Sequence, residues 1–187
     1  MSKQVGKINF KSILNISLRL IIVCTIIAAV VAGVNLLTKD RIAENDENAV
    51  TETIREVFVN GDIQKVDFNS EGKAVESVRR IVEPSDNSIL GFSVICAPKG
   101  FGGEIKMMVA FDADKSIKAV RIMSHSETPG IGDKVKNDAA FASQFVGKSE
   151  TLSYGVDGVD KISGSSKSSK AVLNGVNDAI AVIKTIG

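Results

Sequence analysis

Residues 89–124 read ILGFSVICAPKGFGGEIKMMVAFDADKSIKAVRIMS, and this stretch decides the fold of the C-terminal part of the chain. It holds three apolar runs, 89–97, 104–111 and 117–124, each followed by a short polar or glycine-containing segment. Runs of this length bounded by turn residues are typical of β-strands, and a four-residue polar turn suits an antiparallel hairpin. The stretch therefore predicts three strands in one antiparallel sheet.

Helical patterns lie on both sides of these strands. Apolar residues recur at near-helical intervals over residues 38–58 and again over 168–186, and residues 137–146 suit a short helix. The last of these patterns has a one-sided apolar stripe, formed by Ala171, Val172, Val176, Ala179, Ile180 and Ile183. Such a stripe is expected to pack on the sheet. Residues 61–72 are polar and rich in turn formers, so the predicted fold is an α+β domain with an antiparallel sheet flanked by helices.

A long apolar segment precedes this domain. Residues 20–37 read LIIVCTIIAAVVAGVNLL and carry no charge, and the only charge in the longer span 16–37 is Arg19. About 20 apolar residues are needed to cross a bilayer. A cleaved signal peptide would have a shorter apolar core and a small-residue cleavage site. We therefore expect a retained transmembrane helix at 16–37, between a segment at 1–15 and a domain at 38–187.

The charges beside the span predict its orientation. Before it lie Lys3, Lys7 and Lys11 with no acidic residue, whereas acidic residues outnumber basic ones over 38–50. Basic flanks remain in the cytoplasm. The sequence thus predicts a single-pass protein of the cell membrane, with residues 1–15 cytoplasmic and the domain at 38–187 extracytoplasmic.

Composition excludes several classes of function. The 23 basic and 22 acidic residues give a net charge of +1, too small for a general electrostatic grip on nucleic acid. One histidine and two cysteines are too few for a multi-histidine metal site or an iron–sulfur cluster. We expect no metal site, and no complete catalytic centre within this chain.

Three short segments stand out beside the predicted elements. They are KGFGG at 99–103, SHSETPGIG at 124–132, and DKISGSSKSS at 160–169. Taken singly, each has an ordinary structural explanation: a hairpin loop, a tight turn, and a serine-rich helix cap. The third segment, however, also places hydroxyl groups and lysines at a helix N-terminus, which favours an anion such as phosphate.

The order and spacing of the three segments resemble one family. GFGGEI, HSETPGIG and DKISGSS follow one another here as a GYGG-like loop, an H-x-E-T-P-G-L-G segment and a D-x-x-S-G-A-T motif do in that family. It is the FMN-binding domain family shared by the G subunit of the Rnf complex and the C subunit of the sodium-translocating NADH:quinone reductase. The resemblance extends to the N-terminal membrane helix and so covers nearly the whole chain, and the short juxtamembrane region is more similar to the Rnf protein.

This resemblance implies FMN attached covalently, through a phosphoester to the hydroxyl of the motif threonine. Serine stands at that position here, Ser166, and Ser165 replaces the motif alanine. Ser165, Ser168 or no attachment remain the alternatives, because the serine hydroxyls are chemically equivalent. The residues expected around the cofactor are Gly102, Gly103, Glu127, Thr128, Gly130, Ile131, Gly132, Ser163, Gly164, Ser165, Ser166 and Lys167.

The family's role implies an electron relay in an ion-translocating ferredoxin:NAD⁺ oxidoreductase. Its partners would be the other membrane subunits of an Rnf-type complex and, during maturation, a flavin transferase. Two alternatives remain within flavin chemistry: a subunit of the quinone reductase and a stand-alone extracytoplasmic electron carrier. A membrane-anchored binding or sensory domain without flavin is the alternative of another class.

Overall fold

The computed structural model describes residues 10–69 and 72–186, with side chains from Ile13 onward. Most of the expected cytoplasmic segment, residues 1–9 of 1–15, lies outside the described residues. The chain divides into two compact units, one ending at Glu47 and the other beginning at Asn48.

The first unit consists of most of helix α1 (Phe10–Val57), which is 48 residues long. An 18-residue window of α1 has a mean hydropathy of 2.8, and none of that window is buried within the structure. The helix is therefore long and apolar enough to cross a membrane. The hydroxyls of Thr25 and Thr38 donate to carbonyls four residues earlier, Ile21 O and Val34 O, so these polar groups are satisfied within the helix. The helix expected over residues 38–58 is confirmed to within one residue, and it continues the apolar helix without a break.

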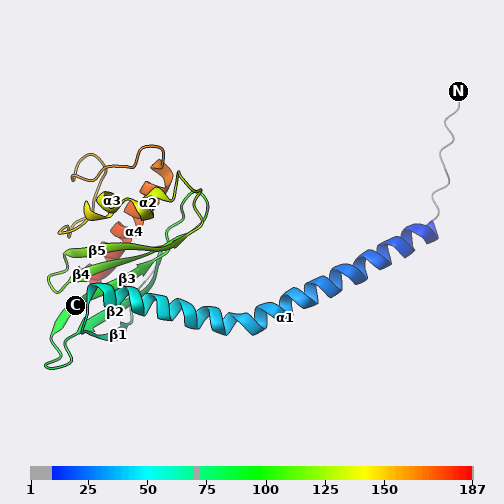
Figure 1. Cartoon of the computed structure of the whole chain (residues 1–187), viewed down its shortest axis with the longest axis horizontal. Helices are drawn as coiled ribbons and strands as arrows, with labels where there is room; N and C mark the ends of the chain where they lie inside the picture. The colour runs from blue at the N-terminus through cyan, green and yellow to red at the C-terminus, as the bar shows by residue number, and fades with distance from the viewer. Residues whose placement is uncertain (1–9, 70–71, 187) are drawn as a thin grey trace. The chain divides into compact units, whose positions relative to one another are not determined.

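The second unit is built on a five-stranded sheet (Figure 1). Its strands are β1 (Asp62–Val66), β2 (Val75–Val82), β3 (Ile89–Cys96), β4 (Ile105–Asp112) and β5 (Ile117–His125). They lie in sequence order, and every neighbouring pair is antiparallel. The three strands predicted from residues 89–124 are confirmed to within one or two residues. The α+β class with an antiparallel sheet is confirmed as well.

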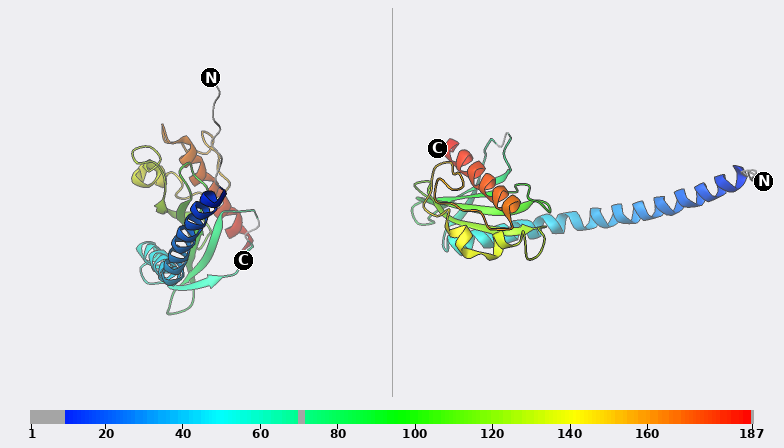
Figure 2. Two further views of the ribbon diagram at one scale, coloured as in Figure 1. Left: turned by 90° about the vertical axis from the view of Figure 1, so that its right-hand side faces the viewer. Right: turned by 90° about the horizontal axis from the view of Figure 1, so that it is seen from above.

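Three helices contribute to the hydrophobic core on one face of the sheet, and Figure 2 shows the longest of them, in orange and red, beside the strands. The helices are α2 (Lys134–Asn137), α3 (Ala139–Ser143) and α4 (Ser166–Thr185). The predicted stripe of α4 is buried, and it shares one hydrophobic core with Phe92, Val109 and Phe111 of the sheet. We call this side the α4 face.

The opposite face is covered by the end of α1. Val50, Ile54 and Phe58 form a second core with Ile81, Ile95, Met108, Ala110 and Ala119. We call this side the α1 face. Strand residues two apart share a face, so Arg79 and Ser93, which are paired across β2 and β3, also point to it. This smaller core therefore encloses polar side chains.

Two expectations for the second unit were wrong. Residues 62–66 were expected in a turn-rich segment but form β1, whose short and mostly exposed sequence carries little apolar signal. The helix expected at 137–146 is interrupted at Asp138, which ends α2 and caps α3. Its carboxylate accepts hydrogen bonds from Ala140 N and Phe141 N, an arrangement that requires non-helical backbone at the cap.

Candidate functional site

The three segments singled out in the sequence meet around one cavity of about 370 Å³ in the second unit. Its walls come from the tip of the β3–β4 hairpin, the turn after β5 and the first turn of α4. The lining residues are Phe101, Glu127, Thr128, Ile131, Gly132, Gly164, Ser165, Ser166, Lys167 and Ser168. This volume lies in the range of small-molecule and cofactor sites.

The first turn of α4 gives the cavity an end suited to an anion. The first N–H groups of any α-helix lack intrahelical partners, and they carry the positive end of the helix dipole. This turn contains no acidic residue, and Lys167 lies within it. Ser165, the N-cap residue, is 3% exposed, and its hydroxyl has no hydrogen-bond partner among the described residues. A buried hydroxyl without a partner at this position can donate to a phosphoryl oxygen.

The serines of this turn differ in what their hydroxyls do. Ser166 is exposed at the cavity wall, and no described residue hydrogen-bonds its hydroxyl. Ser168 is 2% exposed, and its Oγ donates to Glu127 Oε2 over 2.7 Å. Ser169 is fully buried, and its Oγ donates to Ser165 O and accepts from Ile162 N. Of the described serines in this turn, Ser166 is therefore the one that combines access with a free hydroxyl.

The loop before α4 is held in place by contacts with Tyr154 and by a turn at Gly164. Tyr154 donates its phenol to Ser169 O, and burial raises the pKa of Tyr154 well above its usual value, so the phenol remains a donor. Lys161 lies 5.3 Å from the centre of the same ring. Gly164 has φ +80°. Next to it, Ser165 N donates a hydrogen bond to Ile162 O, which closes the turn that leads into α4. The serine turn is therefore rigidly placed at the cavity.

Glu127 is the acidic side chain of the cavity wall, and it is 6% exposed. Its Oε1 accepts from Phe101 N at 2.8 Å and from Gly102 N at 3.2 Å. Its Oε2 accepts from Ser168 Oγ. Both oxygens are thus used to join the hairpin tip to α4. The hydroxyl of Ser168 is therefore engaged by a carboxylate, unlike that of Ser166.

The mouth of the cavity is apolar. Phe101 and Ile131 line it and are 67% and 53% exposed. Lys167 Nζ lies 5.0 Å from the centre of the Phe101 ring, within reach of a cation–π contact. The cavity therefore offers anion donors at the helix end and apolar surface at the mouth, which suits a ligand with a phosphate at one end and a planar ring at the other.

The turn after β5 is closed by a single carbonyl. Thr128 O accepts from the backbone N–H groups of Ile131, Gly132 and Asp133. Gly130, in the same turn, has φ +76°, a conformation that favours glycine. His125 accepts at Nδ1 from Glu127 N over 3.3 Å, so it supports the entry to the turn.

Most of the residues expected around a cofactor lie on the cavity wall. Those that line it are Glu127, Thr128, Ile131, Gly132, Gly164, Ser165, Ser166 and Lys167. Gly102, Gly103, Gly130 and Ser163 belong to the same loops but do not line the cavity. Two further residues line the wall: Phe101, which was not among the expected contacts, and Ser168, which was expected only as an alternative acceptor. The aromatic between the glycines was the available signal for Phe101, whereas the burial of Ser168 depends on tertiary packing.

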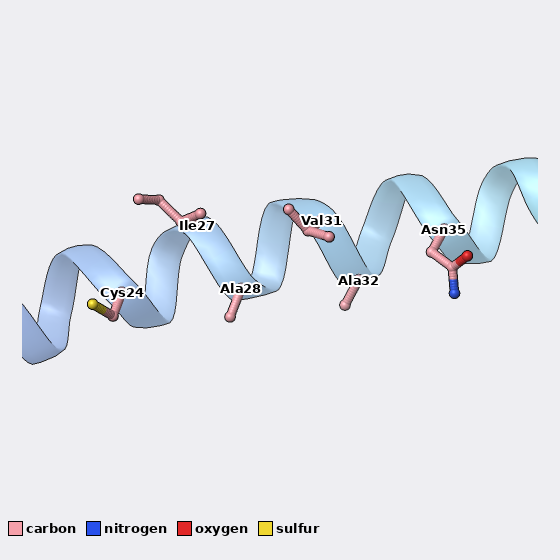
Figure 3. Close-up of a pocket in the computed structure, with 6 residues that line it drawn as sticks. All are labelled: Cys24, Ile27, Ala28, Val31, Ala32 and Asn35. Carbon is pink, nitrogen blue, oxygen red and sulfur yellow. The ribbon is translucent and has the colours of Figure 1, made fainter. Parts of the chain in front are cut away.

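A second hollow lies along α1 and has a different character. Figure 3 shows Cys24, Ala28, Ala32 and Asn35 along this helix, with Ile27 and Val31 beside them. All of its walls belong to a single helix. It holds one strongly polar group, the amide of Asn35, and so offers nothing to hold a cofactor.

Comparison with known protein families agrees with the geometry. Residues 100–181 match the model described as FMN-binding domain, and residues 1–57 match the model described as RnfG N-terminal region. The first match contains all three cavity segments apart from Lys99. The second contains the apolar helix. Together the two matches cover well over half of the chain.

Curated relatives align with nearly the whole chain. The G subunit of the Na⁺-translocating ferredoxin:NAD⁺ oxidoreductase complex of Acetobacterium woodii is 27% identical, over 99% of this chain and 98% of the relative. The G subunit of the proton-translocating ferredoxin:NAD⁺ oxidoreductase complex of Clostridium ljungdahlii is 28% identical, over 93% of each chain.

A solved structure was also matched. The crystal structure of Shewanella oneidensis NqrC aligns with a TM-score of 0.46 and 23% identity, over 65% of this chain and 64% of that one. The two family models and the full-length relatives, taken with the cavity built from the three motif segments, show that the chain belongs to the RnfG family of FMN-binding subunits.

Proposed function

We propose that this chain is a membrane-anchored flavoprotein subunit that relays electrons in an ion-translocating ferredoxin:NAD⁺ oxidoreductase complex of the Rnf type. The relatives that match almost end to end are named as the G subunits of such complexes. When bound, FMN accepts and passes on one or two electrons, which lets it connect carriers of different kinds. The ferredoxin, NAD⁺ and ion-pumping chemistry belongs to the partner subunits.

The residues of the cavity would hold FMN in a defined direction. Ser165 Oγ and the free N–H groups of the first turn of α4 would donate to its phosphate. Phe101 and Ile131 offer the apolar surface that a flavin ring requires. Lys167 adds a positive charge at the wall between these two ends. The observation that carries the proposal is this pairing of an anion end with an apolar mouth.

The link to the protein is a phosphoester at Ser166. Its hydroxyl is the exposed one, whereas those of Ser168 and Ser169 are engaged and buried. A flavin transferase would catalyse attack of Ser166 Oγ on the FMN phosphorus of FAD. One P–O bond forms to serine, the pyrophosphate P–O bond to AMP breaks, and the serine proton leaves with the AMP product. Covalent attachment suits an extracytoplasmic site, where a dissociated cofactor would be lost.

The first unit anchors the domain. Basic residues precede the apolar segment and acidic residues predominate after it, so the positive-inside rule places residues 1–15 in the cytoplasm. Residues 16–37 span the membrane, and 38–187 form the extracytoplasmic domain. Protease added outside intact spheroplasts should digest this domain; complete protection there would reverse the orientation.

Substitution of Ser166 tests the acceptor. The full chain is expressed with a flavin transferase, and flavin fluorescence is read from the denatured band. We expect Ser166→Ala to reduce fluorescence to background and Ser168→Ala to retain it. Trypsin separates the candidates, because Ser165 and Ser166 fall in peptide 162–167 and Ser168 in 168–170. The mass of FMN less water should appear on 162–167, and fragmentation should place it on Ser166.

The other outcomes have clear meanings. Flavin on peptide 168–170 would contradict the acceptor but keep the flavoprotein. A wild-type chain without flavin, produced beside an active transferase, would contradict the electron relay and favour a membrane-anchored binding domain.

A further inference from the structure

We infer that Glu127 is a positioning residue that holds Phe101 at the cavity mouth against the first turn of α4, and so controls how far a bound flavin ring is open to solvent. The inference rests on the proposed function for its second half only. The first half, the placement of the hairpin tip by Glu127, concerns this chain alone and can be tested without flavin.

The hydrogen bonds that Glu127 makes within the protein leave its carboxylate little capacity to bind a cofactor. Oε1 receives two backbone N–H groups of the hairpin tip, and Oε2 receives the Ser168 hydroxyl. Three donors around one buried carboxylate compensate the loss of its hydration. The side chain therefore connects the hairpin tip, 25 residues before Glu127 in sequence, to Ser168, 41 residues after it.

Two glycines leave the space that the Glu127 carboxylate occupies. A Cβ at Gly100 would lie 2.1 Å from Glu127 Oε1, and a Cβ at Gly132 would lie 2.4 Å from Oε2. Real Cβ atoms do not approach this closely, so alanine at either position would displace the carboxylate. Two of the three motif segments thus provide the room that this side chain occupies.

The hydrogen bonds of Glu127 reach directly to Phe101, the aromatic residue at the cavity mouth. One of the two N–H groups bound to Oε1 belongs to Phe101 itself, and the tip is tightened by Gly100 N donating to Gly103 O over 2.7 Å. The Phe101 ring is in turn met by Lys167 from α4. Because Phe101 is 67% exposed, apolar packing does little to hold its ring. Its backbone anchor must do so, and that anchor is Glu127.

The first measurement is amide hydrogen exchange on the flavin-free full chain in detergent, prepared without a transferase. Glu127→Ala removes the acceptor for Phe101 N and Gly102 N, and their exchange should accelerate about tenfold or more, as expected for loss of a charge-assisted bond. Glu127→Gln keeps one acceptor oxygen and a donor for Ser168 Oγ, so it should stay within about threefold of wild type. The amide of Val109, buried in β4, is the reference that should not change.

The second measurement is iodide quenching of flavin fluorescence in the loaded chain. Glu127→Ala should raise the quenching constant about twofold or more relative to wild type, and Glu127→Gln should restore most of the protection. Glutamine has the same shape as glutamate but no charge. Rescue by Glu127→Gln, together with a Val109 amide that stays protected, therefore distinguishes a positioning role from a general loss of structure. Gly100→Ala attacks the same contact from the hairpin side and should reproduce the effect of Glu127→Ala.

Each result decides the inference. The inference is overturned if the amides of Phe101 and Gly102 exchange in Glu127→Ala as they do in the wild type. It is also overturned if the flavin-loaded Glu127→Ala variant has the same iodide quenching constant as the wild type. If Glu127→Ala also exposes Val109, the fold has been lost, and Gly100→Ala then decides by the same two readouts. A wild-type chain without flavin would remove the proposed function, yet the exchange measurement would still show whether Glu127 places the hairpin tip.

Discussion

The two faces of the sheet differ in where their buried polar side chains lie. The α4 face is closed by three helices over a large apolar core, and its buried polar residues Glu127, Ser165, Ser168 and Ser169 all belong to the candidate site. The α1 face is closed by the end of one helix, and its buried Arg79 and Ser93 line neither hollow described above. Buried polar groups therefore gather at a cavity on the α4 face, whereas those on the α1 face are enclosed within the core.

The largest expected effect concerns what closes the α1 face. A chain that begins at Asn48 keeps Val50, Ile54 and Phe58, and it should fold as a soluble domain and accept flavin. A chain that begins at Val59 loses all three buried side chains and should be less stable by on the order of 5 kcal/mol. Urea denaturation of the two forms measures the difference.

Equal stability of these two truncated forms would mean that the end of α1 does not belong to the core of the domain. The second unit would then begin after Phe58 rather than at Asn48.

The next effect compares one large side chain from each core. Phe111 on the α4 face and Ile54 on the α1 face are both 0% exposed. We expect Phe111→Ala to lower the free energy of unfolding by about 4 kcal/mol and Ile54→Ala by about 3 kcal/mol. Val59→Ala, at a residue 78% exposed, is the control and should change it by less than about 0.5 kcal/mol. Denaturant titration in the form that begins at Asn48 gives all three values, and a cost for Ile54→Ala as small as that of the control would show a loosely packed α1 face.

The sequence predicted the strands from β3 to β5 better than those at the other edge of the sheet, β1 and β2. Residues 89–124 have long apolar runs and polar turns, so β3, β4 and β5 were found nearly to the residue. β1 has only five residues, most of them exposed. In β2, two consecutive arginines, Arg79 and Arg80, interrupt the apolar pattern. Short edge strands form because a neighbour offers hydrogen bonds, and that information is not local.

The site shows a similar limit. Motif order brought the correct three segments together, because each consists of residues with a clear local preference for a turn or a helix cap. The motif resemblance favoured Ser166 as the acceptor, but side-chain chemistry alone did not exclude Ser168, since the two side chains are chemically alike. The distinction arises from Glu127, which lies 41 residues away in sequence and occupies the hydroxyl of Ser168. It also did not show that this carboxylate binds the protein itself, which depends on the room left by Gly100 and Gly132.

The smallest effect compares two buried hydroxyls, one from each face. Ser93 Oγ and Ser165 Oγ both lack a hydrogen-bond partner among residues 10–69 and 72–186. An unsatisfied buried hydroxyl costs stability, so Ser93→Ala and Ser165→Ala should each raise the free energy of unfolding by about 1 kcal/mol. Ser165→Ala loses no helix cap, because this side chain caps no N–H group.

The two variants should differ in binding. If Ser165 Oγ is reserved for a phosphoryl oxygen, Ser165→Ala should weaken binding of inorganic phosphate to the flavin-free chain about fivefold, as measured by calorimetry, while Ser93→Ala leaves it unchanged. Equal phosphate affinity in both variants would mean that the two unpaired hydroxyls are alike, and that a buried polar group beside the cavity is no better evidence of function than one enclosed beneath α1.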